Sequence, residues 1–87
     1  MYLIIVYDVE VKKVNKIHKY LKRYLNWIQN SVFEGEVGLA DYVSIKKQLN
    51  KIIKKDIDSI IIFKFSRRSY YEREVIGAEK NRLTSII

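Results

Sequence analysis

The sequence lacks cysteine and proline, and it contains only three glycines, one histidine and one tryptophan. Without cysteine, a disulfide scaffold and a zinc–thiolate site are excluded, and a reducing compartment is expected. A single histidine gives no support to histidine-rich metal sites or to Cys–His catalysis within one chain. The longest apolar run is far shorter than the roughly 18 residues that a membrane span needs, and no signal peptide is recognised. We therefore expect a cytoplasmic protein without a membrane segment.

Positive charge is the most prominent feature of the composition. The 87 residues include 17 lysines and arginines against 10 acidic residues, which gives a formal net charge of +7. A small basic domain suggests an anionic partner, and nucleic acid is the commonest partner of that kind. No linker, repeat or low-complexity segment interrupts the chain, so we expect one domain over residues 1–77 and a C-terminal tail over 78–87.

The hydrophobic pattern predicts strands and helices in alternation. Runs rich in β-branched and aromatic residues predict strands, and apolar residues at helical spacing predict amphipathic helices. For the hairpin we favour a turn at Asn30–Ser31 over one at Glu34–Gly35, because it leaves a longer second strand. Asp41 is the expected N-cap of the second helix. The predicted elements are a strand at 2–7, a helix at 11–25, a hairpin at 27–37, a helix at 41–54, and strands at 58–66 and 71–77.

This order is that of an α+β, ferredoxin-like βαββαβ fold with an extra C-terminal strand. Right-handed crossovers place both helices on one face of the sheet, yet strands 2–7 and 58–66 are apolar on both faces. Strands of that kind need cover on both sides. We therefore expect a homodimer packed sheet to sheet, with the extra strand pairing across to the partner. The predicted interface residues are Tyr2, Ile4, Val6, Val75 and Ile76.

Basic residues cluster at two places in the sequence. Lys12, Lys13 and Lys16 follow the first strand, and Arg67 and Arg68 lie in the segment "KFSRRSYYER", where cations alternate with aromatic residues. We expect these side chains to contact nucleic-acid phosphates with little sequence preference, because no base-reading motif accompanies them. For the tyrosines of the second segment we favour a connector that packs at the dimer interface, and the alternative is that Tyr70 or Tyr71 stacks on a base.

Asp8 is a single carboxylate placed where the first apolar strand ends and the basic helix is about to begin. Taken alone, it is most simply a strand-end residue that hydrogen-bonds the following turn. Glu10 is most simply an acid at the N-terminus of the first helix, where the helix dipole favours it, and the alternative is an outer-shell role beside Asp8.

Four segments resemble the CRISPR-associated protein 2 family, the small subunit of the spacer-acquisition machinery. They are "YLIIVYDV", "KVNKIHKYL", "IQNSVFEGEV" and "EVIG", which together extend over residues 1–77. The resemblance implies a ferredoxin-like homodimer in which Asp8 is the magnesium ligand and catalytic residue of an endonuclease. It also implies a single-stranded RNA or double-stranded DNA substrate, and partnership with the CRISPR-associated integrase. We expect one Mg²⁺ shared by two copies of Asp8 at the dimer axis, since magnesium needs only one or two protein carboxylates.

The sequence departs from the family at two positions that many members fill with arginine. Lys12 and Lys13 lie near the first, and Trp27, which is not a cation, occupies the second. Lysine binds phosphate as a point charge and lacks the planar fork of arginine. Three function classes remain open: a metal-dependent endonuclease, a non-catalytic DNA-binding scaffold for the integrase, and a regulatory domain that binds an acidic protein.

Overall fold

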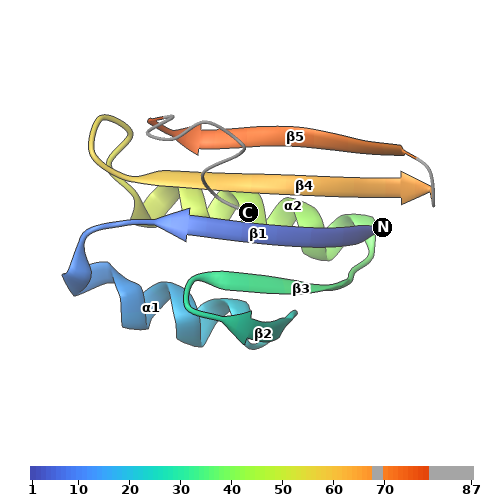
Figure 1. Cartoon of the computed structure of the whole chain (residues 1–87), viewed down its shortest axis with the longest axis horizontal. Helices are drawn as coiled ribbons and strands as arrows, with labels where there is room; N and C mark the ends of the chain where they lie inside the picture. Colours follow the sequence, from blue (N-terminus) through green and yellow to red (C-terminus); the bar gives the residue numbers. More distant parts are fainter. Residues whose placement is uncertain (68–69, 79–87) are drawn as a thin grey trace.

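A computed structural model describes residues 1–67 and 70–78, with side chains for 1–65 and 74–78. Five strands form one antiparallel sheet in the order β2-β3-β1-β4-β5, which puts β1 at its centre. Figure 1 shows the sheet with α2 behind it. The elements are β1 (Tyr2–Asp8), α1 (Val11–Leu21), β2 (Asn26–Gln29), β3 (Val32–Glu36), α2 (Leu39–Ile52), β4 (Ser59–Arg67) and β5 (Tyr70–Gly77). The predicted ferredoxin-like fold with a fifth strand is confirmed.

The hydrophobic core lies between the helices and one face of the sheet. Ile17 and Leu21 of α1, and Ile45 and Leu49 of α2, recur at helical spacing and are fully buried. They pack in one cluster with alternate residues of the strands, because side chains in a strand point to opposite faces in turn. Both helices therefore cover the same face. The strand residues of this inner face are Leu3, Ile5, Tyr7, Phe33, Ile60, Ile62 and Ile76.

The helix boundaries differ from the prediction at both helices. Helix α1 ends at Leu21 rather than at residue 25, although Leu25 still packs in the core and its N–H donates to the Leu21 carbonyl at 2.8 Å. Helix α2 begins at Leu39 with Gly38 as its N-cap, so the prediction of Asp41 as the N-cap is wrong. Asp41 lies in the first turn, where the helix dipole also favours an acid.

The β2–β3 hairpin turns at Asn30–Ser31, as favoured from the sequence. Asn30 has a φ of 43°, and asparagine tolerates this left-handed conformation better than most residues do. The Ser31 carbonyl accepts a hydrogen bond of 3.1 Å from the Tyr7 N–H. The hairpin turn therefore lies beside the end of β1.

Strand β5 pairs with β4 of the same chain, from Ser59 opposite Gly77 to Arg67 opposite Tyr70. Within the chain β5 is the edge strand beside β4, and its pairing with a partner stays a prediction. Gly77 ends β5 with a φ of +95°, and a Cβ there would collide with the Asp58 carbonyl oxygen. Only glycine fits this approach. Of the predicted tail, residues 79–87 lie outside the described residues.

Candidate functional site

Asp8 is the last residue of the central strand β1, and its side chain is exposed. Side chains alternate along a strand, so Asp8 shares a face with Tyr2, Ile4 and Val6, which are all partly buried, while Leu3, Ile5 and Tyr7 are buried in the core. Its register partner on β4 is Ser59. Asp8 thus lies at the end of the sheet face that the helices do not cover.

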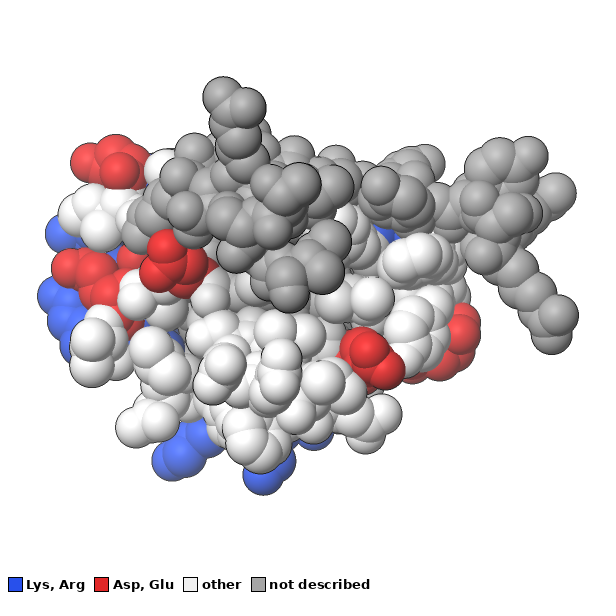
Figure 2. Space-filling model, viewed as in Figure 1, with Lys and Arg blue, Asp and Glu red and all other residues white. Residues whose placement is uncertain are grey.

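This uncovered face, called the open face below, is largely apolar. Tyr2 packs edge to face against Phe65 with ring centroids 6.4 Å apart, and its hydroxyl donates to Glu34 at 2.6 Å. Figure 2, which looks onto the open face, shows mostly uncharged side chains over its described centre. Cross-strand register also places the polar residues Glu34, Glu36 and Ser59 on this face, and its apolar members are Tyr2, Ile4, Val6, Val32, Ile61, Phe63, Phe65 and Val75.

Four of the five residues predicted for a dimer interface lie on the open face, namely Tyr2, Ile4, Val6 and Val75. The fifth, Ile76, is 8% exposed and packs in the core with the helices. Successive residues of a strand point to opposite faces, so Val75 and Ile76 cannot both contribute to one interface. The prediction for Ile76 is therefore corrected.

A buried carboxylate that sequence reasoning missed lies behind Asp8. Asp58, directly before β4, is fully buried and accepts hydrogen bonds from the Glu10 N–H at 3.0 Å and the Lys54 N–H at 2.8 Å. It also forms an ion pair with the Lys13 ammonium, which contacts the Glu10 carboxylate at 3.0 Å. We call Glu10, Lys13, Lys54 and Asp58 the Asp58 cluster. It fixes the segment between Asp8 and α1 against the link from α2 to β4.

Burial alone raises the pKa of Asp58, but hydrogen bonds from the Lys13 ammonium and from the Lys54 and Glu10 N–H groups outweigh it. The pKa of Asp58 is held at about 2, below its usual 3.8. The hydrogen bond to Asp58 raises the pKa of Lys13, and the Lys13 hydrogen bond lowers the pKa of Glu10. Asp58, Lys13 and Glu10 are therefore all charged at neutral pH. Lys13 forms the ion pair with Asp58 and also contacts the carboxylate of Glu10.

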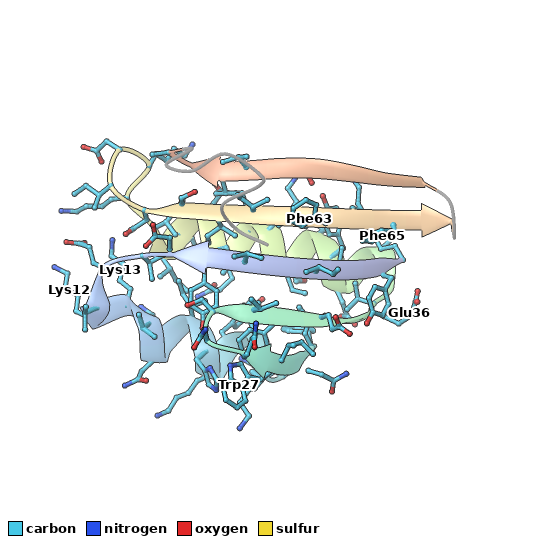
Figure 3. The ribbon with its side chains drawn as sticks, in the orientation of Figure 1. Lys12, Lys13, Trp27, Glu36, Phe63 and Phe65 are labelled. Atoms are coloured by element: carbon cyan, nitrogen blue, oxygen red, sulfur yellow. The ribbon has the colours of Figure 1, made fainter. Side chains whose placement is uncertain are left out.

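The basic residues predicted to contact nucleic acid have different environments. Lys12 and Lys16 are exposed on α1, and Figure 3 shows Lys12 near the end of the sheet where β1 finishes. The Lys13 side chain is only 12% exposed and its ammonium is paired within the Asp58 cluster, so we correct its predicted role from phosphate contact to support of the site. Arg67 is described only through its backbone in β4, and Arg68 lies outside the described residues.

A second polar cluster holds α2 against the outer strands. The Glu74 carboxylate accepts hydrogen bonds from the Tyr42 hydroxyl and, at 2.8 Å, from the Lys46 ammonium. The Lys64 ammonium donates to the Tyr42 hydroxyl at 3.3 Å. The hydrogen bond from Lys46 lowers the pKa of Glu74. Lys46 therefore forms an ion pair with a carboxylate of its own chain, which distinguishes it from the exposed lysines of α1.

Asp8 offers one carboxylate, which is an oxygen ligand of the kind that hard cations such as magnesium take. Among residues 1–67 and 70–78, no group of three or more His, Cys, Asp or Glu residues is placed to hold a metal ion. Magnesium keeps several of its waters and takes one or two carboxylates plus substrate phosphate oxygens. One exposed aspartate per chain fits that requirement.

No helix among the described residues is long and apolar enough to cross a membrane.

The chain is a small α+β domain of the ferredoxin-like class. Its sheet has one uncovered apolar face, and an acid lies at the end of the central strand. Within that class, residues 1–73 match the family described as CRISPR associated protein Cas2. The chain belongs to the Cas2 family.

Relatives and solved structures agree with this assignment. Proteins named CRISPR-associated endoribonuclease Cas2 are 54% identical in Pyrococcus furiosus, over the whole of both chains, and 52% identical in Methanocaldococcus jannaschii, over all of this chain and 76% of that one. A crystal structure of Cas2 has a TM-score of 0.73 at 44% identity and covers 95% of this chain and 93% of its own. Streptococcus pyogenes Cas2 has a TM-score of 0.71 at 32% identity, covering 78% and 89%.

Proposed function

We propose that the chain is a magnesium-dependent endonuclease that acts as a homodimer in CRISPR spacer acquisition, together with the CRISPR-associated integrase. Membership in the Cas2 family supports this proposal, as do the relatives that are named endoribonucleases. Single-stranded RNA is accordingly the first substrate to test, and double-stranded DNA is the second. The observation that carries the proposal is the position of Asp8 at the end of the central strand, on the open face.

The apolar open face supports the dimer. Ile4, Val6 and Phe63 lie outside the core cluster of the chain, and burying apolar area gains about 25 cal/mol per Å². A two-fold axis that passes near the end of β1 brings both copies of Asp8 toward each other, because an atom close to the axis is also close to its symmetry mate. Two nearby carboxylates repel one another unless a cation lies between them.

In the proposed active site, the two Asp8 carboxylates hold Mg²⁺, and Lys12 and Lys16 hold substrate phosphates as point charges. When bound, the ion supplies polarisation of the phosphodiester and a lowered pKa for the attacking water. The Asp58 cluster keeps the segment that follows Asp8 in a fixed position, as supporting hydrogen bonds do around other metal ligands.

The first prediction concerns the dimer. Light scattering at micromolar concentration should give twice the chain mass of 10.4 kDa. Ile4→Glu should give a monomer that remains folded, because Ile4 lies outside the core cluster and its substitution places two like charges at the interface by symmetry. Val43→Glu, on the exposed side of α2, is the matched control and should remain dimeric. A monodisperse wild-type monomer would refute the proposed dimer.

The second prediction concerns the metal. Cleavage of single-stranded RNA should stop in EDTA and return when magnesium is added in excess, because the ion supplies the charge that activates the phosphodiester. The reaction is followed by gel electrophoresis with a labelled oligonucleotide, and duplex DNA of the same length is assayed in parallel. Cleavage that continues unchanged in EDTA would overturn the metal-dependent function.

A further inference from the structure

The indole of Trp27 is unusually exposed for its residue type. Trp27 lies on the edge strand β2, opposite Phe33 of β3, and 53% of its surface is accessible to solvent. Tryptophan is highly buried on average, and where it is exposed it is enriched at binding surfaces. Ile28, the next residue, is 47% exposed. Packing inside the chain therefore does not account for a large aromatic residue at this position.

The ring is nevertheless held in a defined orientation. Its Nε1–H donates to the Asn30 carbonyl at 2.9 Å, and the His18 ring of α1 meets it edge to face at 5.8 Å between centroids. His18 is itself fixed against buried Phe33, with centroids 5.1 Å apart. Because its single N–H is already bonded to Asn30, the indole offers a ligand only apolar π surface, which is preorganised and therefore loses little conformational entropy on binding.

The electrostatic surroundings of Trp27 select an anionic ligand. Residues 11–33, which include α1 and β2, contain six lysines and arginines and no acidic residue, and the nearest acid along the paired strand is Glu34, opposite Asn26. Lys19, Lys22 and Arg23 follow His18 within five positions of the sequence and are exposed, and the Arg23 guanidinium lies over the Tyr20 ring. In Figure 3 Trp27 lies at the edge of the molecule beside α1 and β2, and Figure 2 shows basic side chains along the same edge. A flat apolar ring carried by a basic segment matches the two chemical parts of a nucleotide.

We propose that Trp27 stacks on an unpaired base of single-stranded nucleic acid while the cations of α1 contact the flanking phosphates. This inference rests on the proposed nucleic-acid function and adds the residue that distinguishes single strands from duplexes. Stacking requires a base whose face is free, and a duplex covers both faces of its interior bases. Every base has such a face, so stacking binds with little sequence preference.

Trp27 and Asp8 lie on opposite faces of the sheet, because Trp27 is aligned with the core residue Phe33 and Asp8 shares the open face with Val6. The indole N–H bonds to Asn30, and the adjacent Ser31 carbonyl accepts the N–H of Tyr7, which directly precedes Asp8. The register places Trp27 level with Ile5 and on the helix side, so a strand bound at Trp27 reaches Asp8 only by passing around the β2–β3 turn beside the end of β1.

Trp27 is the only tryptophan in the chain, so its fluorescence reports on this site alone. A short oligouridine should quench wild-type emission in EDTA, where no cleavage is expected, and a duplex of equal length should quench it much less. Labelled-oligonucleotide anisotropy should show that Trp27→Ala weakens single-strand binding by about 5- to 150-fold, the effect of losing one stacked base. Duplex affinity should change by less than about twofold, since phosphate contacts remain. Trp27→Phe should recover part of the loss, and Val43→Ala, an equally exposed apolar residue on α2, should cause none.

Each other outcome has a definite meaning. Binding of both oligonucleotides without quenching, or with equal affinity for wild type and Trp27→Ala, would overturn the role of Trp27 and leave the proposed function standing. An emission change that follows protein concentration and ignores oligonucleotide would assign Trp27 to contact with a second copy and would also overturn it. If the wild type binds neither oligonucleotide, in EDTA or in magnesium, the proposed function itself fails. If Trp27→Ala does not fold, wild-type quenching and Trp27→Phe affinity decide the question.

Discussion

Asp8→Asn is expected to lower the cleavage rate by about 10²-fold or more, which corresponds to about 3 kcal/mol of lost transition-state stabilisation. A neutral amide is a poor ligand for magnesium, and two-fold symmetry removes both carboxylates at once. The fold should be unaffected, because the Asp8 side chain is exposed at the end of β1. Nucleic-acid binding should remain or increase slightly, since the change removes two negative charges from each dimer.

The matched control for this variant is Glu36→Gln. Glu36 is the register partner of Tyr2 near the opposite end of β1, its side chain is 71% exposed, and its ion pair with the N-terminus is of a kind that contributes little. The same carboxylate-to-amide change there should leave the rate within about twofold. If cleavage persists unchanged in Asp8→Asn and also in EDTA, the activity does not belong to Asp8 and the non-catalytic scaffold becomes the better function.

Asp58→Asn is expected to lower the free energy of unfolding by about 3–5 kcal/mol, the usual cost of removing one partner of a buried ion pair. The amide cannot balance the Lys13 ammonium, whose side chain is only 12% exposed. A small domain has a total stability of about 5–15 kcal/mol, so this variant should be close to unfolding. Urea denaturation at fixed protein concentration measures the difference.

The control for that variant lies two residues earlier. Asp56 is exposed in the turn before β4, so Asp56→Asn makes the same chemical and charge change outside the cluster and should alter stability by less than about 0.5 kcal/mol. If both variants lose the same unfolding free energy, the effect of Asp58→Asn comes from the change in net charge, and the contacts of Asp58 contribute nothing to stability.

The stability that Asp58 provides should depend on pH in a defined window. Its pKa is about 2 in the folded chain against 3.8 without these contacts. The folded pKa is depressed, so the contribution is fully present above pH 3.8 and is lost as the pH falls toward about 2. The difference in unfolding free energy between wild type and Asp58→Asn should therefore shrink over this range. A difference that stays constant down to pH 2 would contradict the lowered pKa.

Much of the fold is predictable from residue patterns. Strands rich in β-branched and aromatic residues, in alternation with helices whose apolar residues have 3.6-residue spacing, are enough to predict the ferredoxin-like order. The turn at Asn30–Ser31 follows from a residue that tolerates positive φ. The end of a helix is less predictable, because Leu25 fits the helical period and is buried, yet it reaches the core from a turn after α1.

The environment of a charged side chain was the least predictable part of the site. Lys12, Lys13 and Lys16 look alike in sequence, but only Lys13 is paired with Asp58, a residue 45 positions away. Local spacing carries no signal for such a pair. The apolar pair Val75–Ile76 poses a similar problem, since the sequence shows two interface candidates and only the register with β4 shows which one faces the helices.

The central claim is that two copies of Asp8 act together across the open face, and a mixed dimer tests it most directly. A wild-type chain and an Asp8→Asn chain with different affinity tags are co-expressed, and the species that carries both tags is isolated and assayed with magnesium. A single ion held by both carboxylates predicts a cleavage rate close to that of the Asp8→Asn homodimer. A rate about half that of the wild type, as expected for two independent sites in a symmetric dimer, would contradict the shared site.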